Sequence, residues 1–382
     1  MSEELAGRII GLRREDGQLC ERRAALSPGD VGSWLPNRTY AIFSHTHKSQ
    51  KENMPSLREA LAKHIRLVDY ELIRENNART ITPFGQWAGI VGCIQGLHVL
   101  GLRLLSLGFT SPFVNIPPAQ CNRSYEEATS HIKSILSKIS SFKKLCKSFG
   151  PFVIGITGKG TSSLGAQKFF RDINVPQISP DDIDSCSFDK IYVVVLNKSN
   201  TISHRNPGVM YDQDEFISHP ERYKSIFVSK YGSKLSMLVN CIYWEPGRPR
   251  LIENSDLPQI IDSQKLLVVS DVSCDINGSI ECVSKGMTML FPWCLYDTSG
   301  HCIENPIGKE KALAITVIEN LPSLFARDAS IEFSSKLMRY IDHLAKSDHS
   351  TDIEDTNWSS ALLDAVICNK GNLCSLYKNI NV

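Results

Sequence analysis

A glycine-rich turn follows directly after a strand-length apolar segment in the middle of the sequence. Residues 152–157 read FVIGIT, and residues 158–166 read GKGTSSLGA before a helix-like stretch. Glycines permit a tight turn and let backbone N–H groups approach a pyrophosphate, while the N-terminus of the following helix favours negative charge. The spacing GxGxxxxG departs from the usual GxGxxG, so a plain strand-to-helix turn is the alternative interpretation. The order of elements nevertheless predicts a dinucleotide site at Gly158, Gly160, Thr161 and Gly165.

The residues after this helix bear on which nicotinamide cofactor would fit. NAD-binding proteins often place an acidic residue at the end of the next strand, where it binds the ribose hydroxyls. Residues 178–180 (ISP) occupy that neighbourhood and contain no acid, and Asp181 comes only after them. With Lys168 and Arg171 nearby, this arrangement tolerates a 2′-phosphate and favours NADP(H) over NAD(H).

A second group of reactive side chains follows the strand-like residues 39–43. His45 and His47 would share one face if the strand continued, and such a pair could bind a metal. No third ligand motif stands out, so we predict no metal site. The alternative is a general acid/base role for His45, because an imidazole titrates near neutral pH.

Basic residues near this histidine could hold anionic substrate groups. Lys48 lies three residues after His45, and Arg23 and Arg79 could each bind a carboxylate through two parallel hydrogen bonds. By spacing alone, the sequence favours an ordinary solvated surface position for each of these residues over a substrate-binding one.

The elements that must position these groups fall into two sets. Apolar runs that are typical of strands buried on both faces occur at residues 152–157, 191–196, 237–242 and 266–272. Their alternation with connections of helical length predicts a doubly wound parallel sheet. The N-terminal part alternates strands at 39–43 and 66–70 with helices at 54–65, 86–107 and 125–149, and further helices are expected at 332–344 and 358–368. Gly150 and Pro151 predict a domain boundary, with insertions in the long segment 184–231.

Composition limits the classes of protein to which the chain can belong. A single core rarely grows past about 250–300 residues, so 382 residues favour two domains. A net charge of +1 gives no bulk attraction to nucleic acid or an anionic membrane, and no apolar run approaches the ~20 residues of a membrane span. The twelve cysteines include no CxxC pair, and we expect them to be reduced and mostly buried.

Five blocks of sequence resemble one enzyme family in the same order. They are FSHTHKSQKENM at residues 43–54, FGQWAG at 84–89, NCIYWE at 240–245, DVSCDINGSIE at 271–281 and NLP at 320–322. These sequence blocks resemble the lysine-ketoglutarate reductase half of the bifunctional aminoadipic semialdehyde synthases, and they are most similar to the plant enzymes. More distantly, the stretch from Glu21 and Arg23 to Pro28 is similar to the opening motif of saccharopine and alanine dehydrogenases.

The resemblance implies an α/β fold with two Rossmann-like domains, parallel sheets flanked by helices, and a cleft between the domains. Residues 1–150 would form a substrate domain completed by residues 328–382, and residues 151–327 the dinucleotide domain. The implied reaction is reductive condensation of L-lysine with 2-oxoglutarate to saccharopine by NADPH. No nucleic acid or membrane partner is implied, and a homo-oligomer is one possibility.

The resemblance also implies roles for individual residues. His45 resembles the acid/base histidine, Lys48 a residue that tunes the site, and Arg23 a substrate-carboxylate ligand, with Arg79 as the second such arginine. Asn240 and Asp271 would lie at strand ends where open α/β sheets bind ligands. The opening residues, with two acids and no long apolar stretch, predict a cytoplasmic location, and mitochondrial animal members of the family make a mitochondrial one the alternative.

Two departures from the family leave other readings open. The stretch between Pro28 and Arg38 is too short for the elements that family members carry there, including a catalytic lysine, and no residue matches that lysine. The second, dehydrogenase half is not expected in this sequence. The alternatives are a catalytically impaired or regulatory remnant that still binds dinucleotide, and an NAD-linked dehydrogenase running towards lysine.

Overall fold

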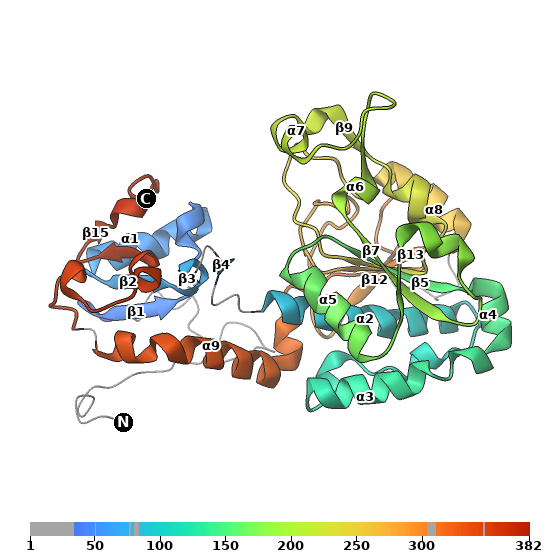
Figure 1. The fold of residues 1–382 in the computed structure, drawn as a ribbon, viewed down its shortest axis with the longest axis horizontal. Coiled ribbons are helices and arrows are strands. Elements are labelled where there is room, and N and C mark those ends of the chain that lie inside the picture. The colour runs from blue at the N-terminus through green and yellow to red at the C-terminus, as the bar shows by residue number, and fades with distance from the viewer. Residues whose placement is uncertain (1–33, 50, 76–77, 80–83, 304–310, 347) are drawn as a thin grey trace. The chain divides into compact units, whose positions relative to one another are not determined.

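The chain forms two compact units that differ from the predicted division. The structure, a computed structural model, describes residues 34–382 apart from 50, 76–77, 80–83, 304–310 and 347 (Figure 1). Unit 1 combines the described residues up to Phe84 with Ala326–Val382, and unit 2 is Gly85–Phe325. The boundary predicted at residue 150 is therefore misplaced, because the helix that begins at Gly85 packs against the sheet of unit 2 and the helices of residues 125–149 belong to the same apolar core.

Unit 2 is built on a seven-stranded sheet in the order β12-β13-β11-β10-β5-β7-β6. All neighbours pair in parallel except β12 with β13. The strands are β5 (Phe152–Thr157), β6 (Gln177–Ile178), β7 (Ile191–Leu196), β10 (Met237–Asn240), β11 (Val268–Asp271), β12 (Trp293–Tyr296) and β13 (Leu313–Thr316). Along β5, Phe152, Ile154 and Ile156 enter one apolar core and Val153 the other, as expected for a strand covered on both faces.

The long helix α2 (Gly85–Ser106) covers one face of this sheet. It packs on α5 (Thr161–Asp172), β10 and β11, and its apolar side chains form much of the larger core (Figure 1). A Cβ on Gly89 would collide with the carbonyl of Ser162, so glycine permits the close approach to α5. Contrary to the expectation from apolar runs, α2 is long and apolar enough to cross a membrane, as no other described helix is. Most of it is buried inside unit 2, as in the core helix of a soluble domain.

The remaining helices of unit 2 correct one prediction. Residues 125–149 form two helices, α3 (Tyr125–Leu136) and α4 (Lys143–Phe149), rather than one. A single 3₁₀ turn at Ile139–Ser141 separates them, where the Ser141 hydroxyl donates to the carbonyl of Lys138. The predicted insertion holds α6 (Lys198–Thr201), the hairpin of β8 (Ile202–His204) with β9 (Tyr223–Ser225), and α7 (Gln213–Ser218); α8 is Leu257–Ser263.

Unit 1 contains a four-stranded sheet in the order β1-β2-β14-β15. Its elements are β1 (Thr39–Ile42), β2 (Arg66–Asp69), β14 (Val366–Asn369), β15 (Asn372–Leu373), the hairpin of β3 (Arg74–Glu75) with β4 (Ala78–Arg79), α1 (Met54–Ala62), α9 (Ala326–Lys346) and α10 (Ser360–Leu363). β1 and β2 run parallel, and β14 joins β2 antiparallel. The single helix predicted at 358–368 is thus wrong in its second half, because the buried β-branched residues Val366 and Ile367 complete the sheet.

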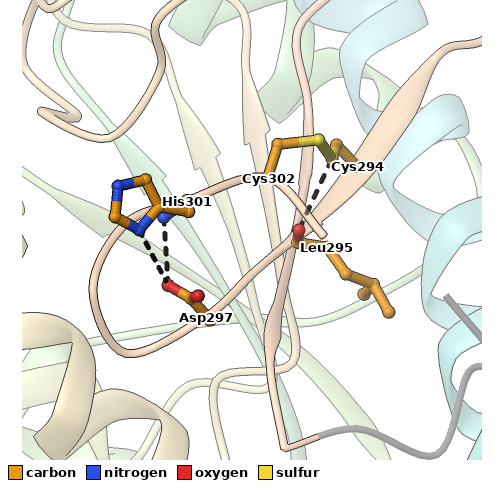
Figure 2. Close-up of a disulfide and its surroundings, with 5 residues drawn as sticks. All are labelled: Cys294, Leu295, Asp297, His301 and Cys302. Carbon is orange, nitrogen blue, oxygen red and sulfur yellow. Dashed lines mark hydrogen bonds and ion pairs between the residues drawn. A yellow bond between two sulfur atoms is a disulfide. The ribbon is translucent and has the colours of Figure 1, made fainter. Parts of the chain in front are cut away.

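A disulfide in unit 2 contradicts the expectation that the cysteines are reduced. Cys294 on β12 is bonded to Cys302, on the chain segment that returns beside β12 (Figure 2). Tyr296 bridges to Cys302 in antiparallel fashion, which brings the two cysteine Cα atoms to 6.1 Å, within the usual disulfide range. The other described cysteines are free, and several are buried as expected.

Candidate active site

The glycine turn adopts the geometry that a pyrophosphate cradle requires. Gly158 follows β5 with φ +88°, a conformation that favours glycine, and its N–H donates to the carbonyl of Leu196 at 3.1 Å. The hydroxyl of Ser163 donates back to the Gly158 carbonyl at 2.8 Å. A Cβ on Gly160 would meet nothing within 4 Å, so the space beside this backbone is open.

Helix α5 begins at this open space. Gly160 is its N-cap and supplies no side chain to bind the first N–H groups, which therefore remain for an anion. Thr161 is the first helical residue and is exposed. A Cβ on Gly165 would collide with the carbonyl of Gln86, so Gly165 serves the packing of α5 on α2. These observations fit a dinucleotide phosphate at the turn.

Asn240 and Asp271 end β10 and β11, but both side chains are buried. The Asn240 amide accepts from the Thr157 hydroxyl at 2.9 Å and donates to Asp271 at 2.9 Å and to Ser279 at 2.8 Å. The backbone N–H of Cys241 donates to Thr157 at 3.0 Å. The network ties the ends of β5, β10 and β11 together, which gives Asn240 and Asp271 a positioning role in this structure.

Burial also changes the titration of Asp271. It raises the pKa of Asp271 to about 6, against opposing hydrogen bonds from Ser273 and Asn240. One carboxylate oxygen accepts both of these bonds, while Oδ2 is buried without a partner in the described part of the chain. Asp271 therefore keeps its proton at pH values at which an ordinary carboxyl group is already ionised.

A cavity of about 230 Å³ opens at the carboxyl ends of β10 and β11. It is lined by Ser162, Cys241, Ile242, Tyr243, Val272, Ser273 and Asp275. The next two strands of the chain, β6 and β7, lie on one side of β5, and the later strand β10 lies on the other. The cavity therefore adjoins the point where the strand order reverses. Open α/β sheets bind ligands at such a point.

The strand order changes the position at which a ribose-binding residue is expected. β7, and not β6, lies beside β5, with Leu196 paired to Thr157. The residues beside the glycine turn are therefore Asn197 and Lys198 rather than residues 178–180. Neither is acidic, so the absence of an acid holds at the corrected position as well.

In unit 1, His45 lies in a turn rather than in a strand. β1 ends at Ile42, and His45 has φ 52° and precedes a 3₁₀ turn at Thr46–Lys48. The prediction that His45 and His47 share a strand face is thus wrong. Left-handed backbone at a non-glycine residue is uncommon and is often found at functional sites.

The imidazole of His45 is held by a carboxylate. Its Nδ1 lies 2.8 Å from Oε2 of Glu71, and the ring is 44% exposed. Its ring also stacks on Phe43, with centroids 6.3 Å apart. These contacts orient the ring and leave Nε2 as the nitrogen that can exchange a proton with a substrate.

Asp69, at the end of β2, organises this turn. Its fully buried carboxylate accepts from the Ser44 hydroxyl at 2.7 Å, the His45 N–H at 3.0 Å and the Glu71 N–H at 2.9 Å. His47 Nδ1 lies 3.7 Å from the same carboxylate. Among the described residues no group of three metal-ligating side chains is assembled here or elsewhere.

Sequence reasoning missed Asp69 and Glu71. They are the first and third residues of the sequence DYE (residues 69–71), and Asp69 is the last residue of the buried strand β2. Nothing local shows that this strand lies beside the histidine turn. Lys48 lies in the 3₁₀ turn and Arg79 on β4, with side chains outside the described residues, and Arg23 lies outside them entirely. Their proposed roles remain predictions, as does the shortening between Pro28 and Arg38, which lies mainly in the undescribed residues.

Comparisons with known proteins identify relatives of this chain. The chain is 33% identical over 365 residues to the "alpha-aminoadipic semialdehyde synthase, mitochondrial" of Bos taurus. It is 32% identical over 362 residues to the "alpha-aminoadipic semialdehyde synthase" of Arabidopsis thaliana. Each match covers 91% of the chain but only 39% and 33% of the relative. The saccharopine dehydrogenase [NAD(+), L-lysine-forming] of Schizosaccharomyces pombe is 24% identical over 305 residues, which are 78% of the chain and 68% of that protein.

A solved structure shows the fold. An L-alanine dehydrogenase matches with a TM-score of 0.52 and 12% identity, over 97% of this chain and 98% of that one. No protein-family model matches the chain. The fold is thus the expected two-domain α/β fold of Rossmann type. By sequence, the chain is a homologue of the aminoadipic semialdehyde synthases and spans a third to two fifths of their length. It is also related to the saccharopine dehydrogenase oxidoreductases.

Proposed function

We propose that the chain is a lysine-ketoglutarate reductase, which condenses L-lysine with 2-oxoglutarate and reduces the product to saccharopine with NADPH. The relatives named above support a role in lysine degradation and an oxidoreductase reaction of the saccharopine type. The single observation that carries the proposal is the oriented imidazole of His45, held by Glu71 at 2.8 Å. The glycine turn of unit 2 supports the use of a nicotinamide dinucleotide.

The chemistry needs proton transfers at nitrogen and oxygen. The ε-amine of lysine adds to the keto carbon of 2-oxoglutarate, and loss of water leaves a C=N bond. NADPH supplies a hydride to that carbon when bound, and a proton completes the secondary amine. In our proposal His45 donates and accepts these protons through Nε2, while Glu71 stabilises the ring when it carries both protons.

The substrate carboxylates need cationic partners. We assign Arg23 and Arg79 to this task because guanidinium groups bind carboxylates through paired hydrogen bonds, and Lys48 to tuning the histidine site. In unit 2, the backbone of Gly158, Gly160, Thr161 and Gly165 would hold the pyrophosphate. Asn240 and Asp271 would keep the strand ends in place beneath it.

Steady-state assays of the purified chain test the proposal. NADPH oxidation at 340 nm should require L-lysine and 2-oxoglutarate together and stop when either is omitted. His45→Gln should lower kcat by about 10²–10⁴-fold, the usual contribution of a positioned acid/base. His131→Gln, at a surface helix position, is the matched control and should leave the rate unchanged. No oxidation by folded wild-type protein would refute the reductase and leave a non-catalytic binding protein.

The similarity to the saccharopine dehydrogenase [NAD(+), L-lysine-forming] of Schizosaccharomyces pombe favours one second candidate, an NAD-linked dehydrogenase that forms lysine. It predicts NADH production from saccharopine and NAD⁺ at a higher kcat/KM than NADPH oxidation in the other direction. For the compartment we propose the cytoplasm, with mitochondria as the alternative that the names of the animal relatives support. Imaging of the full-length protein in its own cells separates the two.

A further inference from the structure

The end of β7 places a lysine beside the glycine turn. The N–H of Gly158 donates to the carbonyl of Leu196 at 3.1 Å, and Asn197 and Lys198 follow immediately. In dinucleotide-binding folds the residues that end this neighbouring strand read the adenosine ribose. An acid there binds the 2′-hydroxyl of NAD, and a basic residue accommodates the 2′-phosphate of NADP.

Lys198 does not point freely into solvent. Its Nζ lies 4.9 Å from the centroid of the Phe216 ring, and the guanidinium carbon of Arg248 lies 5.8 Å from the same centroid. The lysine is partly buried, and burial together with the charge of Arg248 holds its pKa below the usual value. Two cations therefore converge on one aromatic ring.

The charges at this spot do not balance. Glu245 pairs with Arg248 at 2.6 Å, and its charge also favours the Lys198 ammonium, so one carboxylate serves two cations. Among the described residues Lys198 has no ion pair of its own. An anion bound here would relieve the repulsion between Lys198 and Arg248. A phosphate dianion matches a surplus of positive charge held by one ammonium and one guanidinium group.

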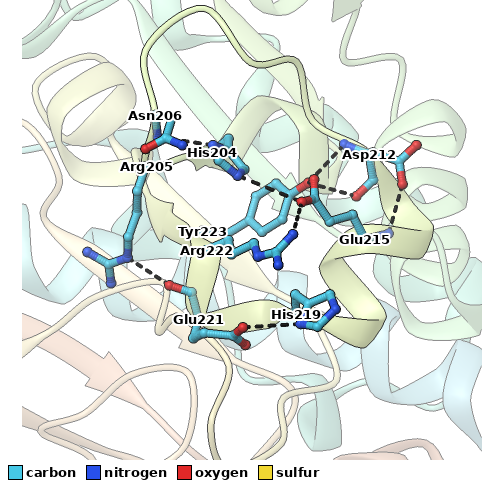
Figure 3. Close-up of polar contacts among 9 residues, drawn as sticks. All are labelled: His204, Arg205, Asn206, Asp212, Glu215, His219, Glu221, Arg222 and Tyr223. Carbon is cyan, nitrogen blue, oxygen red and sulfur yellow. Dashed lines mark hydrogen bonds and ion pairs between the residues drawn. The ribbon is translucent and has the colours of Figure 1, made fainter.

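The surrounding insertion keeps this site in place. Phe216 on α7 is 3% exposed and packs against Tyr211 and Tyr223. As Figure 3 shows, Glu215 of the same helix accepts from Tyr223 Oη at 2.8 Å and pairs with Arg222 at 2.8 Å. These contacts join α7 to the hairpin of β8 and β9, so Phe216 is a fixed platform for both cations.

We propose that Lys198, assisted by Arg248, binds the 2′-phosphate of NADP(H) and sets the cofactor preference of this chain. The inference rests on the proposed dinucleotide site and deepens it. It replaces Lys168 and Arg171 in that role. Lys168 is committed elsewhere, since it bonds to Asp172 and lies 4.5 Å from the centroid of the Tyr125 ring. Arg171 lines a different cavity, with Asn174 and Pro176.

Calorimetric titration with nucleotide fragments tests the assignment without any need for turnover. Wild-type protein should bind 2′,5′-ADP more tightly than 5′-AMP. Lys198→Ala should weaken 2′,5′-ADP by about tenfold or more, the value of one charge-assisted hydrogen bond, and change 5′-AMP by less than about twofold. Lys198→Arg retains the cation and should keep most of the preference. Circular dichroism of each variant checks that it folds.

Two lysine variants are matched controls. Lys230→Ala removes a lysine that also lies over a ring, 5.3 Å from the centroid of Tyr231, and Lys168→Ala removes the earlier candidate. Both should leave the preference for 2′,5′-ADP intact. The inference is overturned by equal wild-type binding of the two fragments, by equal losses for both in Lys198→Ala, or by loss of the preference in Lys168→Ala. If Lys198→Ala selectively weakens binding of 2′,5′-ADP but the wild-type protein does not oxidise NADPH, the proposed reductase activity is refuted and the role of Lys198 stands.

Discussion

Replacement of Asp69 by asparagine measures how much the Asp69 carboxylate contributes to the stability of the histidine turn. The carboxylate accepts three hydrogen bonds, from Ser44 Oγ and the backbone N–H groups of His45 and Glu71, and it is inaccessible to solvent. Asparagine has the same shape but only one acceptor oxygen. If its oxygen takes the place of Oδ2, its NH₂ group faces the N–H of Glu71, so one buried bond is lost and two donors oppose each other.

The structure sets the size of the effect. Hydrogen bonds to charged groups contribute about 1.5–3 kcal/mol each, and a buried donor without a partner costs about 1–3 kcal/mol. Loss of one bond and weakening of the other two therefore lowers the free energy of unfolding of unit 1 by about 2–4 kcal/mol. The His45 turn should loosen too, so kcat should fall together with stability. Asp69→Ala removes the shared acceptor of all three donors at once and is the less discriminating change.

Two measurements report on Asp69→Asn. Urea unfolding gives the change in free energy, and hydrogen exchange of peptides from residues 39–72 shows whether the loss is confined to the β1–β2 region. Asp355→Asn, at an exposed position of the same unit, is the control and should stay within about 0.5 kcal/mol of wild type. An Asp69→Asn variant equally close to wild type, with unchanged exchange, would refute the role assigned to this carboxylate.

Three further predictions concern unit 2. Gly158→Ala should destabilise the protein by about 1–2 kcal/mol because the φ of Gly158 is +88°. Gly160→Ala should leave the melting temperature nearly unchanged, but it should weaken NADPH binding because the added Cβ occupies the open space beside the turn. The pKa of Asp271 is raised to about 6, so its contribution is most favourable below the unfolded-state value and is lost as pH rises through 6. Relative to Asp271→Asn, wild type should therefore lose up to roughly 3 kcal/mol of stability between about pH 4 and 7, measured by urea titrations. Reduction of the disulfide between Cys294 and Cys302, which are eight residues apart, should lower the free energy of unfolding by about 2–3 kcal/mol. Titration of free thiols with and without reductant shows whether the disulfide is present.

Sequence alone determined the features that depend on neighbouring residues. The strand β5, the glycine turn and helix α5 follow one another within 21 residues, and each is specified by local preference: apolar side chains, positive φ and helix formation. The family blocks likewise lie in continuous stretches, so the resemblance and the two-domain fold could be inferred before any coordinates. His45 was identified in the same way.

Tertiary structure decided everything that depends on which segments become neighbours. Helix α2 was assigned to the wrong unit because only its packing on β10, β11 and α5 shows where it belongs. Asp69 and Glu71 lie 24 and 26 residues from His45 and meet it only because β1 and β2 pair in parallel.

The position of the proposed cofactor-specificity residue likewise depends on which strands become neighbours. In sequence the strand after α5 is β6, but the sheet places β7 beside β5. The proposed specificity position therefore moves from residues 178–180 to Lys198. Strand order is set by how the apolar faces of all the helices and strands are buried together, and no local pattern encodes it. The chemistry of each residue could therefore be predicted from its type, and its partners only from the fold.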